Sequence, residues 1–154
     1  VARRHNFEIT KEECLMRILL IIAISLLALD VYAGSANSPV GLWETFDENG
    51  QLQSTVEVRI EDDRLFANIV RLHNSDDKNP MCDKCQGDLY GKPVIGMQIF
   101  DGLTLKKEIW QKGAVFDPKT GDSYKGKVWL DGGKLYVRGY IGFLYKTRVW
   151  RRVL

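Results

Sequence analysis

The chain has 154 residues, of which 45% are hydrophobic and 27% charged, and its net charge is +2. A nucleic-acid-binding domain usually has a strong excess of positive charge, which this chain lacks, so we expect no nucleic-acid partner. The length leaves room for one domain beyond the N-terminal segment described next.

The N-terminal segment has the pattern of a secretory signal peptide. Arg17 supplies the positive charge, residues 18–29 form an apolar run, and residues 31–33 (VYA) suit signal peptidase. The apolar run is shorter than the roughly 20 residues that cross a bilayer, although an uncleaved membrane anchor is the alternative. We expect cleavage near Ala33, so that the membrane matters only during export.

Met16 is a better translation start than Val1, and residues 1–15, with Cys14, are interpreted as an upstream extension. The predicted organisation is an upstream extension and signal peptide over residues 1–33, followed by a single domain over residues 34–154.

From residue 40 onward, short strands alternate with turn residues. We predict strands over residues 40–47, 52–61 and 64–72. In the second of these, Val56 and Val58 alternate with polar residues, which is the period of two that a half-buried strand requires.

Residues 73–92 interrupt this rhythm with a polar, turn-rich stretch, HNSDDKNPMCDKCQGDLYGK. A loop of this length is uncommon in a compact domain and is often functional. It contains Cys82 and Cys85, and export to an oxidising compartment favours a disulfide between them. Two alternatives stay open: a redox C-x-x-C pair, and half of a zinc site that His73 and nearby aspartates complete.

The second half of the chain returns to strands. Residues 93–103 fit a short helix or an irregular strand, and residues 104–116 fit one long strand with a bend or bulge at Gly113. Turns at DPKTGD and DGG separate three further predicted strands, over 123–130, 134–141 and 146–153.

The predicted fold class is therefore all-β, after the N-terminal signal-peptide helix. About eight antiparallel strands in one domain suit a closed up-and-down barrel, which has no exposed edges and can hold one small ligand. A β-sandwich is the alternative.

Six motifs occur in a fixed order and together resemble the DUF2147 family of exported bacterial proteins. The resemblance implies a lipocalin-like (calycin) β-barrel in the periplasm or outside the cell, and it implies no reaction. The motifs are GLWET (41–45), NPMCDKCQGD (79–88), PVIGM (93–97), FDPKTGDSY (116–124), LYVRGYIG (135–142) and TRVWRR (147–152).

The first and last predicted strands also resemble those of lipocalins. Gly41-Leu42-Trp43 is a G-x-W motif on the first strand, and Arg148 and Arg152 lie on the last. In lipocalins such a tryptophan closes one end of the barrel beneath an arginine, a cation–π contact. The resemblance therefore implies barrel closure by Trp43 with Arg148 or Arg152.

Aromatic residues crowd the second half, and a barrel cavity is usually lined by such residues with a few polar groups among them. Whether Tyr136, Arg138 and Tyr140 face the interior or the outside is open, because the strand alternation allows either. The ligand-binding candidates are Trp110, Tyr124, Trp129, Tyr136, Arg138 and Tyr140.

Catalytic motifs are not recognisable downstream of residue 33, where His73 is the one histidine. We expect no cofactor and no metal, and we favour a non-enzymatic protein that binds a small hydrophobic or amphipathic molecule. One alternative is an envelope or interaction protein that uses the 73–92 loop, which predicts a filled barrel without a cavity and an exposed loop shaped by the disulfide. The other is a thiol-redox or metal-dependent enzyme. The oligomeric state does not follow from the sequence.

Overall fold

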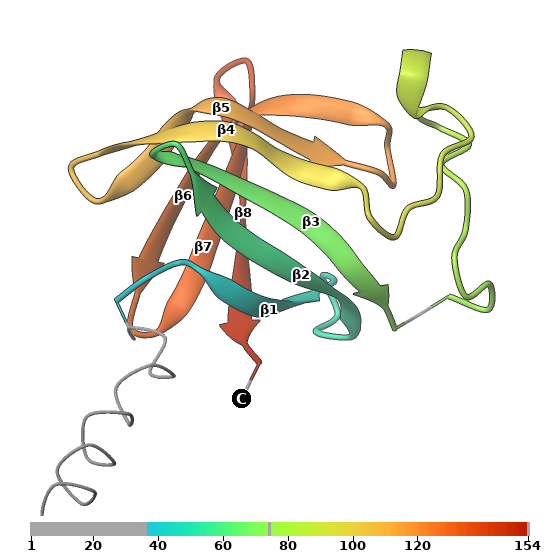
Figure 1. Cartoon of the computed structure of the whole chain (residues 1–154), viewed down its shortest axis with the longest axis horizontal. Helices are drawn as coiled ribbons and strands as arrows, with labels where there is room; N and C mark the ends of the chain where they lie inside the picture. The colour runs from blue at the N-terminus through green and yellow to red at the C-terminus, as the bar shows by residue number, and fades with distance from the viewer. Residues whose placement is uncertain (1–36, 74, 154) are drawn as a thin grey trace, which may run out of the picture. The chain divides into compact units, whose positions relative to one another are not determined.

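The computed structural model describes residues 37–73 and 75–153, so the predicted signal peptide lies outside the described residues. The described chain forms eight strands and one short 3₁₀ turn, coloured from blue to red along the sequence in Figure 1. The strands are β1 (Gly41–Phe46), β2 (Leu52–Glu61), β3 (Arg64–Leu72), β4 (Gln98–Lys106), β5 (Ile109–Asp117), β6 (Asp122–Asp131), β7 (Lys134–Ile141) and β8 (Leu144–Arg152), and the 3₁₀ turn is η1 (Gly87–Leu89).

The strands close into an up-and-down barrel, which confirms the predicted fold class and excludes the sandwich. Each strand pairs antiparallel with the next, and β8 pairs with β1 through Trp43–Arg152 and Glu44–Arg151. Closure leaves no strand edge exposed for pairing with another chain. No helix within the described ranges is long and apolar enough to span a bilayer.

The prediction of one strand over residues 104–116 is wrong. The chain reverses at Lys107 and Glu108, whose φ angles are 49° and 64°, and this turn joins β4 to β5. Two consecutive residues with positive φ make the type I′ geometry that tight hairpins favour. The predicted irregularity near Gly113 is present as a bulge, because the β5–β6 register shifts between Gln111 and Ala114.

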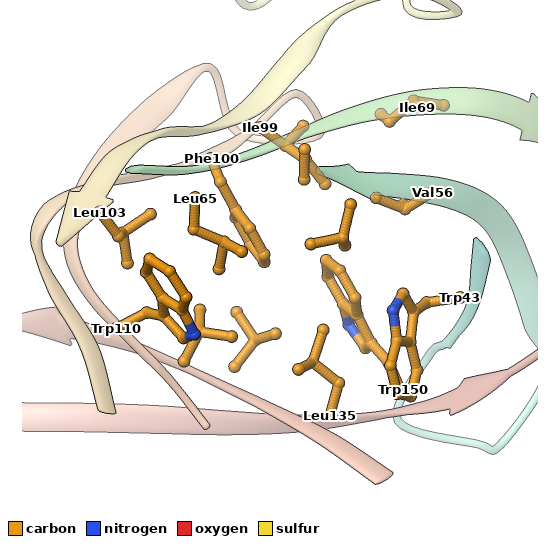
Figure 2. Packing of buried hydrophobic residues seen from close by; sticks show 14 residues of the cluster. Trp43, Val56, Leu65, Ile69, Ile99, Phe100, Leu103, Trp110, Leu135 and Trp150 are labelled. Atoms are coloured by element: carbon orange, nitrogen blue, oxygen red, sulfur yellow. The ribbon is translucent and has the colours of Figure 1, made fainter. Parts of the chain in front are cut away.

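The barrel interior is filled by apolar side chains that alternate inward along the strands (Figure 2). Phe100 of β4 and Trp150 of β8 stack with their ring centroids 5.2 Å apart, which joins opposite walls of the barrel. Each fully buried side chain of this size contributes about 1.5–3 kcal/mol to the free energy of unfolding. The buried side chains are those of Trp43, Val56, Val58, Leu65, Ala67, Ile69, Ile99, Phe100, Leu103, Trp110, Val128, Leu135, Val137 and Trp150.

The two ends of the barrel differ. The β4–β5 and β6–β7 turns lie at the end where β1 begins, which we call the closed end. The β1–β2, β5–β6 and β7–β8 turns lie at the other end, together with the long connection from β3 to β4. That connection runs along the right side of the view in Figure 1. We call this second end the open end.

Candidate ligand-binding cavity

The connection between β3 and β4 is folded, although its sequence is polar and rich in turn residues. Met81 and Pro93 form an isolated antiparallel bridge. The backbone nitrogen of Cys82 donates to the carbonyl of Lys92 at 2.8 Å, and that of Gly91 donates to the carbonyl of Cys82 at 2.9 Å. These bonds fold the segment back on itself.

Cys82 and Cys85 are joined by a disulfide, and both side chains are buried. They form a small second core with Met97, against which Val94 and Phe116 pack. The disulfide therefore lies beneath a loop whose other residues are mostly exposed. It anchors the loop to the barrel.

The β5–β6 turn holds this loop closely. A Cβ atom on Gly121 would lie 2.0 Å from the carbonyl oxygen of Lys84, so only glycine fits there, and its φ of 79° also favours glycine. The loop and the turn therefore come together at the open end as one packed unit.

A cavity of about 700 Å³ opens between this unit and the barrel walls. Aliphatic side chains from several strands form its walls, and the Trp150 ring belongs to its lining as well as to the core. Polar groups come from β1, β2 and the turn between them, from the β5–β6 turn, from Ser75 of the β3–β4 connection and from Arg148. The apolar lining comprises Phe46, Ile69, Leu72, Pro80, Met81, Val94, Ile99, Val115, Phe116, Pro118, Val137 and Trp150, with Cys82 beside them.

One ion-paired cluster lies beside this cavity. Glu48 accepts from Lys146 and from Arg148, whose Nη2 lies 3.2 Å from Glu48 Oε1. The hydrogen bond and the charge of Lys146, followed by the charge of Arg148, lower the pKa of the Glu48 carboxyl below its usual value. A carboxylate and two cations at this position can orient the polar group of a bound molecule.

The closed end carries the G-x-W residues. The guanidinium carbon of Arg152 lies 4.3 Å from the centroid of the Trp43 ring, and Trp43 Nε1 donates to the carbonyl of Pro39 at 2.8 Å. Arg148 does not share this contact, because it lies four residues nearer the open end and pairs with Glu48 there. Of the two arginines proposed for barrel closure, only Arg152 is in place for it.

Four of the six ligand-binding candidates lie on the outer face of the barrel, which corrects the prediction that they line a cavity. Leu135 and Val137 point inward and are buried, so Tyr136, Arg138 and Tyr140 point outward. Trp129 stacks on Tyr136, with ring centroids 5.3 Å apart.

The other two candidates lie inside the barrel but do not line the cavity. Trp110 is part of the core near the β4–β5 turn, and Tyr124 is half-buried near the β5–β6 turn. The Tyr124 hydroxyl donates to Asp122 at 3.2 Å. The aliphatic lining was not predicted. Its signal in the sequence is the alternation of apolar residues at the strand ends next to the 73–92 loop.

His73 lies on the surface and its Nε2 is 2.9 Å from the Thr55 hydroxyl. Within residues 37–73 and 75–153, no three His, Cys, Asp or Glu side chains gather closely enough to hold a metal ion. The disulfide occupies the two sulfurs that a zinc site or a reduced redox pair would use.

Comparison with solved structures supports the fold. The barrel is similar to that of a Helicobacter pylori protein, HP1028, described as belonging to the lipocalin family, with a TM-score of 0.66 and 18% sequence identity. The similarity covers 76% of this chain and 84% of that one. No curated protein matches the sequence. The model of the family described as uncharacterized proteins conserved in bacteria (DUF2147) matches residues 41–152, and the chain therefore belongs to that family.

Proposed function

We propose that this protein is an exported, non-enzymatic binding protein that holds one small, partly hydrophobic molecule in the open end of its barrel. The observation that carries the proposal is the cavity of about 700 Å³, whose lining combines aliphatic walls with polar groups at the open end. Pockets for small molecules typically have volumes of roughly 300–1,000 Å³ and this mixture of linings.

The arrangement of the lining favours an amphipathic ligand. Its apolar part would lie against Ile69, Ile99 and Val137, where water would otherwise cover aliphatic surface. Its polar part would lie near Arg148 and Glu48, which offer both donors and acceptors. The interaction-protein alternative predicted a barrel filled throughout, which would leave no such space at the open end.

Export is part of the proposal. The family is bacterial, and Cys82 and Cys85 are paired in a disulfide, which persists in the periplasm or outside the cell but is rare in the cytosol. We propose that residues 1–33 direct this export and are removed near Ala33.

A titration with N-phenyl-1-naphthylamine, an uncharged fluorescent apolar probe, tests the binding site. Leu72 lines the cavity and Val70, two residues away on the same strand, is exposed. The Leu72→Trp variant fills the cavity and is expected to weaken probe binding by at least ~10-fold, since it removes the space for buried apolar area. The matched Val70→Trp variant is expected to bind as the wild type does.

The folded state of both variants is checked by their far-ultraviolet circular dichroism. The proposal is supported if the wild type and Val70→Trp each bind one probe per chain saturably and Leu72→Trp does not. Equal binding by wild type and Leu72→Trp, or no saturable binding by wild type stripped of bound organic molecules, contradicts it.

A further inference from the structure

The β7–β8 turn exposes an unusual amount of apolar surface. Ile141, Phe143, Leu144 and Tyr145 are 65%, 92%, 62% and 59% exposed, and we call these four residues the apolar tip. Gly142, with a φ of 60°, begins the two-residue turn that presents Phe143. Turn positions usually carry polar residues. A phenylalanine so exposed adds nothing to the folded core, and a cluster of such residues marks an interaction site.

The apolar tip projects from the mouth of the cavity. Val137 and Arg148 are register partners and both line the cavity, and Ile141 and Leu144 are partners four residues further along the hairpin. At about 3.3 Å per residue, the tip lies about 13 Å beyond that pair. It is thus the outermost part of β7 and β8 at the open end.

The outer face of β6, β7 and β8, which leads up to the tip, is basic. Lys125 and Lys127 on β6 and Arg138 on β7 lie closest to the tip, and Asp131 lies at the far end of β6. Of the acidic groups at the open end, Glu48 pairs with Lys146 and Arg148, and Asp122 accepts from Tyr124. The exposed Asp76, Asp77, Asp83 and Asp88 belong to the β3–β4 connection and not to this face. The outward-facing charged residues of the three strands are Lys125, Lys127, Asp131, Lys134, Arg138 and Arg151.

Aromatic rings on this face are covered by each other and by the cations. Arg138 lies over Tyr145 and Trp129, with its guanidinium carbon 4.2 Å and 5.1 Å from the ring centroids. Lys127 Nζ lies 5.5 Å from the centroid of Tyr140. These cations occupy ring faces on which nucleic-acid bases would otherwise stack.

We infer that the apolar tip and the basic face beside it bind the surface of a lipid bilayer that contains anionic phospholipid. Phe143 and Leu144 would enter the boundary between headgroups and acyl chains, and Tyr145 would lie at headgroup level. Lys125 and Lys127 would reach the phosphates, as long basic side chains do at such interfaces. This docking would place the mouth of the cavity at the membrane. The mature protein would then contact a membrane after its export as well as during it.

Co-sedimentation with vesicles tests the inference. The purified protein is mixed with vesicles of phosphatidylcholine alone, or of phosphatidylcholine with phosphatidylglycerol, and the bound fraction is measured against lipid concentration. Binding is expected to the anionic vesicles and to weaken at high salt. The double variant Phe143→Ser/Leu144→Ser is expected to lose at least ~10-fold in partition coefficient, because it removes the inserted apolar area.

The matched control is Leu105→Ser. Leu105 is 55% exposed beside the β4–β5 turn, at the opposite end of the barrel. This variant is expected to bind anionic vesicles as the wild type does. The Lys125→Gln/Lys127→Gln variant is expected to lose ~10-fold or more, since each basic residue near an anionic surface contributes to binding.

Three results would overturn the inference: no binding to anionic vesicles, equal binding to both kinds of vesicle, or undiminished binding by the tip variant. A fourth contradicting result would come from light scattering on the purified protein. If the wild type is a dimer and Phe143→Ser/Leu144→Ser is a monomer, the tip binds a second copy of the chain instead of a membrane. Thermal unfolding of each variant shows that the loss comes from the surface and not from unfolding.

Discussion

Arg152 on the last strand lies over the ring of Trp43 on the first, with its guanidinium carbon 4.3 Å from the ring centroid. The same guanidinium donates to the carbonyls of Ser38 at 2.5 Å and Val40 at 2.9 Å. The β1–β8 seam has two partner pairs, Trp43–Arg152 and Glu44–Arg151, so these contacts add substantially to it. We propose that they close the barrel.

Arg152→Ala is expected to lower the free energy of unfolding by about 2–4 kcal/mol, because it removes a cation–π contact and two charge-assisted hydrogen bonds. Urea unfolding followed by tryptophan fluorescence measures this loss. Arg148→Ala serves as the control and is expected to cost less, since its ion pair with Glu48 is exposed to solvent. Equal losses in both variants would show that Arg152 has no special role in closure.

Gly41→Ala is expected to cost about 1–3 kcal/mol, because the φ of Gly41 is 132° and its added Cβ would lie 2.8 Å from Arg152 Nη1. Part of this cost comes from the clash with Arg152. The double variant Gly41→Ala/Arg152→Ala should therefore lose less than the sum of the two single losses in the same urea assay. Strict additivity would refute the steric part of this account.

Titration of Glu48 is expected to show a pKa below its usual value, and Lys146→Gln should raise that pKa more than Arg148→Gln does. Carbon-detected NMR of the side-chain carboxyl across acidic pH measures all three values. Because the folded pKa is lowered, this cluster stabilises the fold above the unfolded pKa, and the contribution disappears as the pH falls through the folded pKa. A larger effect of Arg148→Gln would reverse the assigned order of causes.

Removal of the disulfide is expected to loosen the loop more than the barrel. In Cys82→Ala/Cys85→Ala, amide hydrogen exchange at residue 82 and at Gly91 should accelerate, since these amides donate to the carbonyls of Lys92 and of residue 82 within the folded loop. Closing so short a ring stabilises by only about 2 kcal/mol in the chain-entropy model. Acceleration spread evenly over the core strands would show that the disulfide supports the whole barrel.

The sequence was sufficient for a closed all-β fold of about eight strands, because alternation such as that of Val56 and Val58 indicates which face of a strand is buried. It was insufficient at Lys107 and Glu108. Those residues take positive φ without any glycine, proline or asparagine to mark the turn. Residues 104–116 were therefore predicted as one strand, although the turn between β4 and β5 lies within them.

The cavity was harder to predict than the fold. Alternation shows that Val137 and Arg138 face opposite sides of the sheet but not which side is inside, and the aromatic content of the outer face pointed to the wrong one. The true lining combines Leu72, Val94 and Trp150 across long sequence separations. Only the closed register of all eight strands and the folded loop bring them together.

Native mass spectrometry of the protein, purified without organic solvent from the envelope of its own bacterium, shows whether a molecule occupies the open end. We expect a population whose mass exceeds that of the chain, with one disulfide, by a single small molecule that organic extraction removes. The Leu72→Trp variant, prepared in the same way, should lack that population. A wild-type mass equal to that of the bare chain, or an adduct that Leu72→Trp retains, would contradict the assignment of the open end as a binding site.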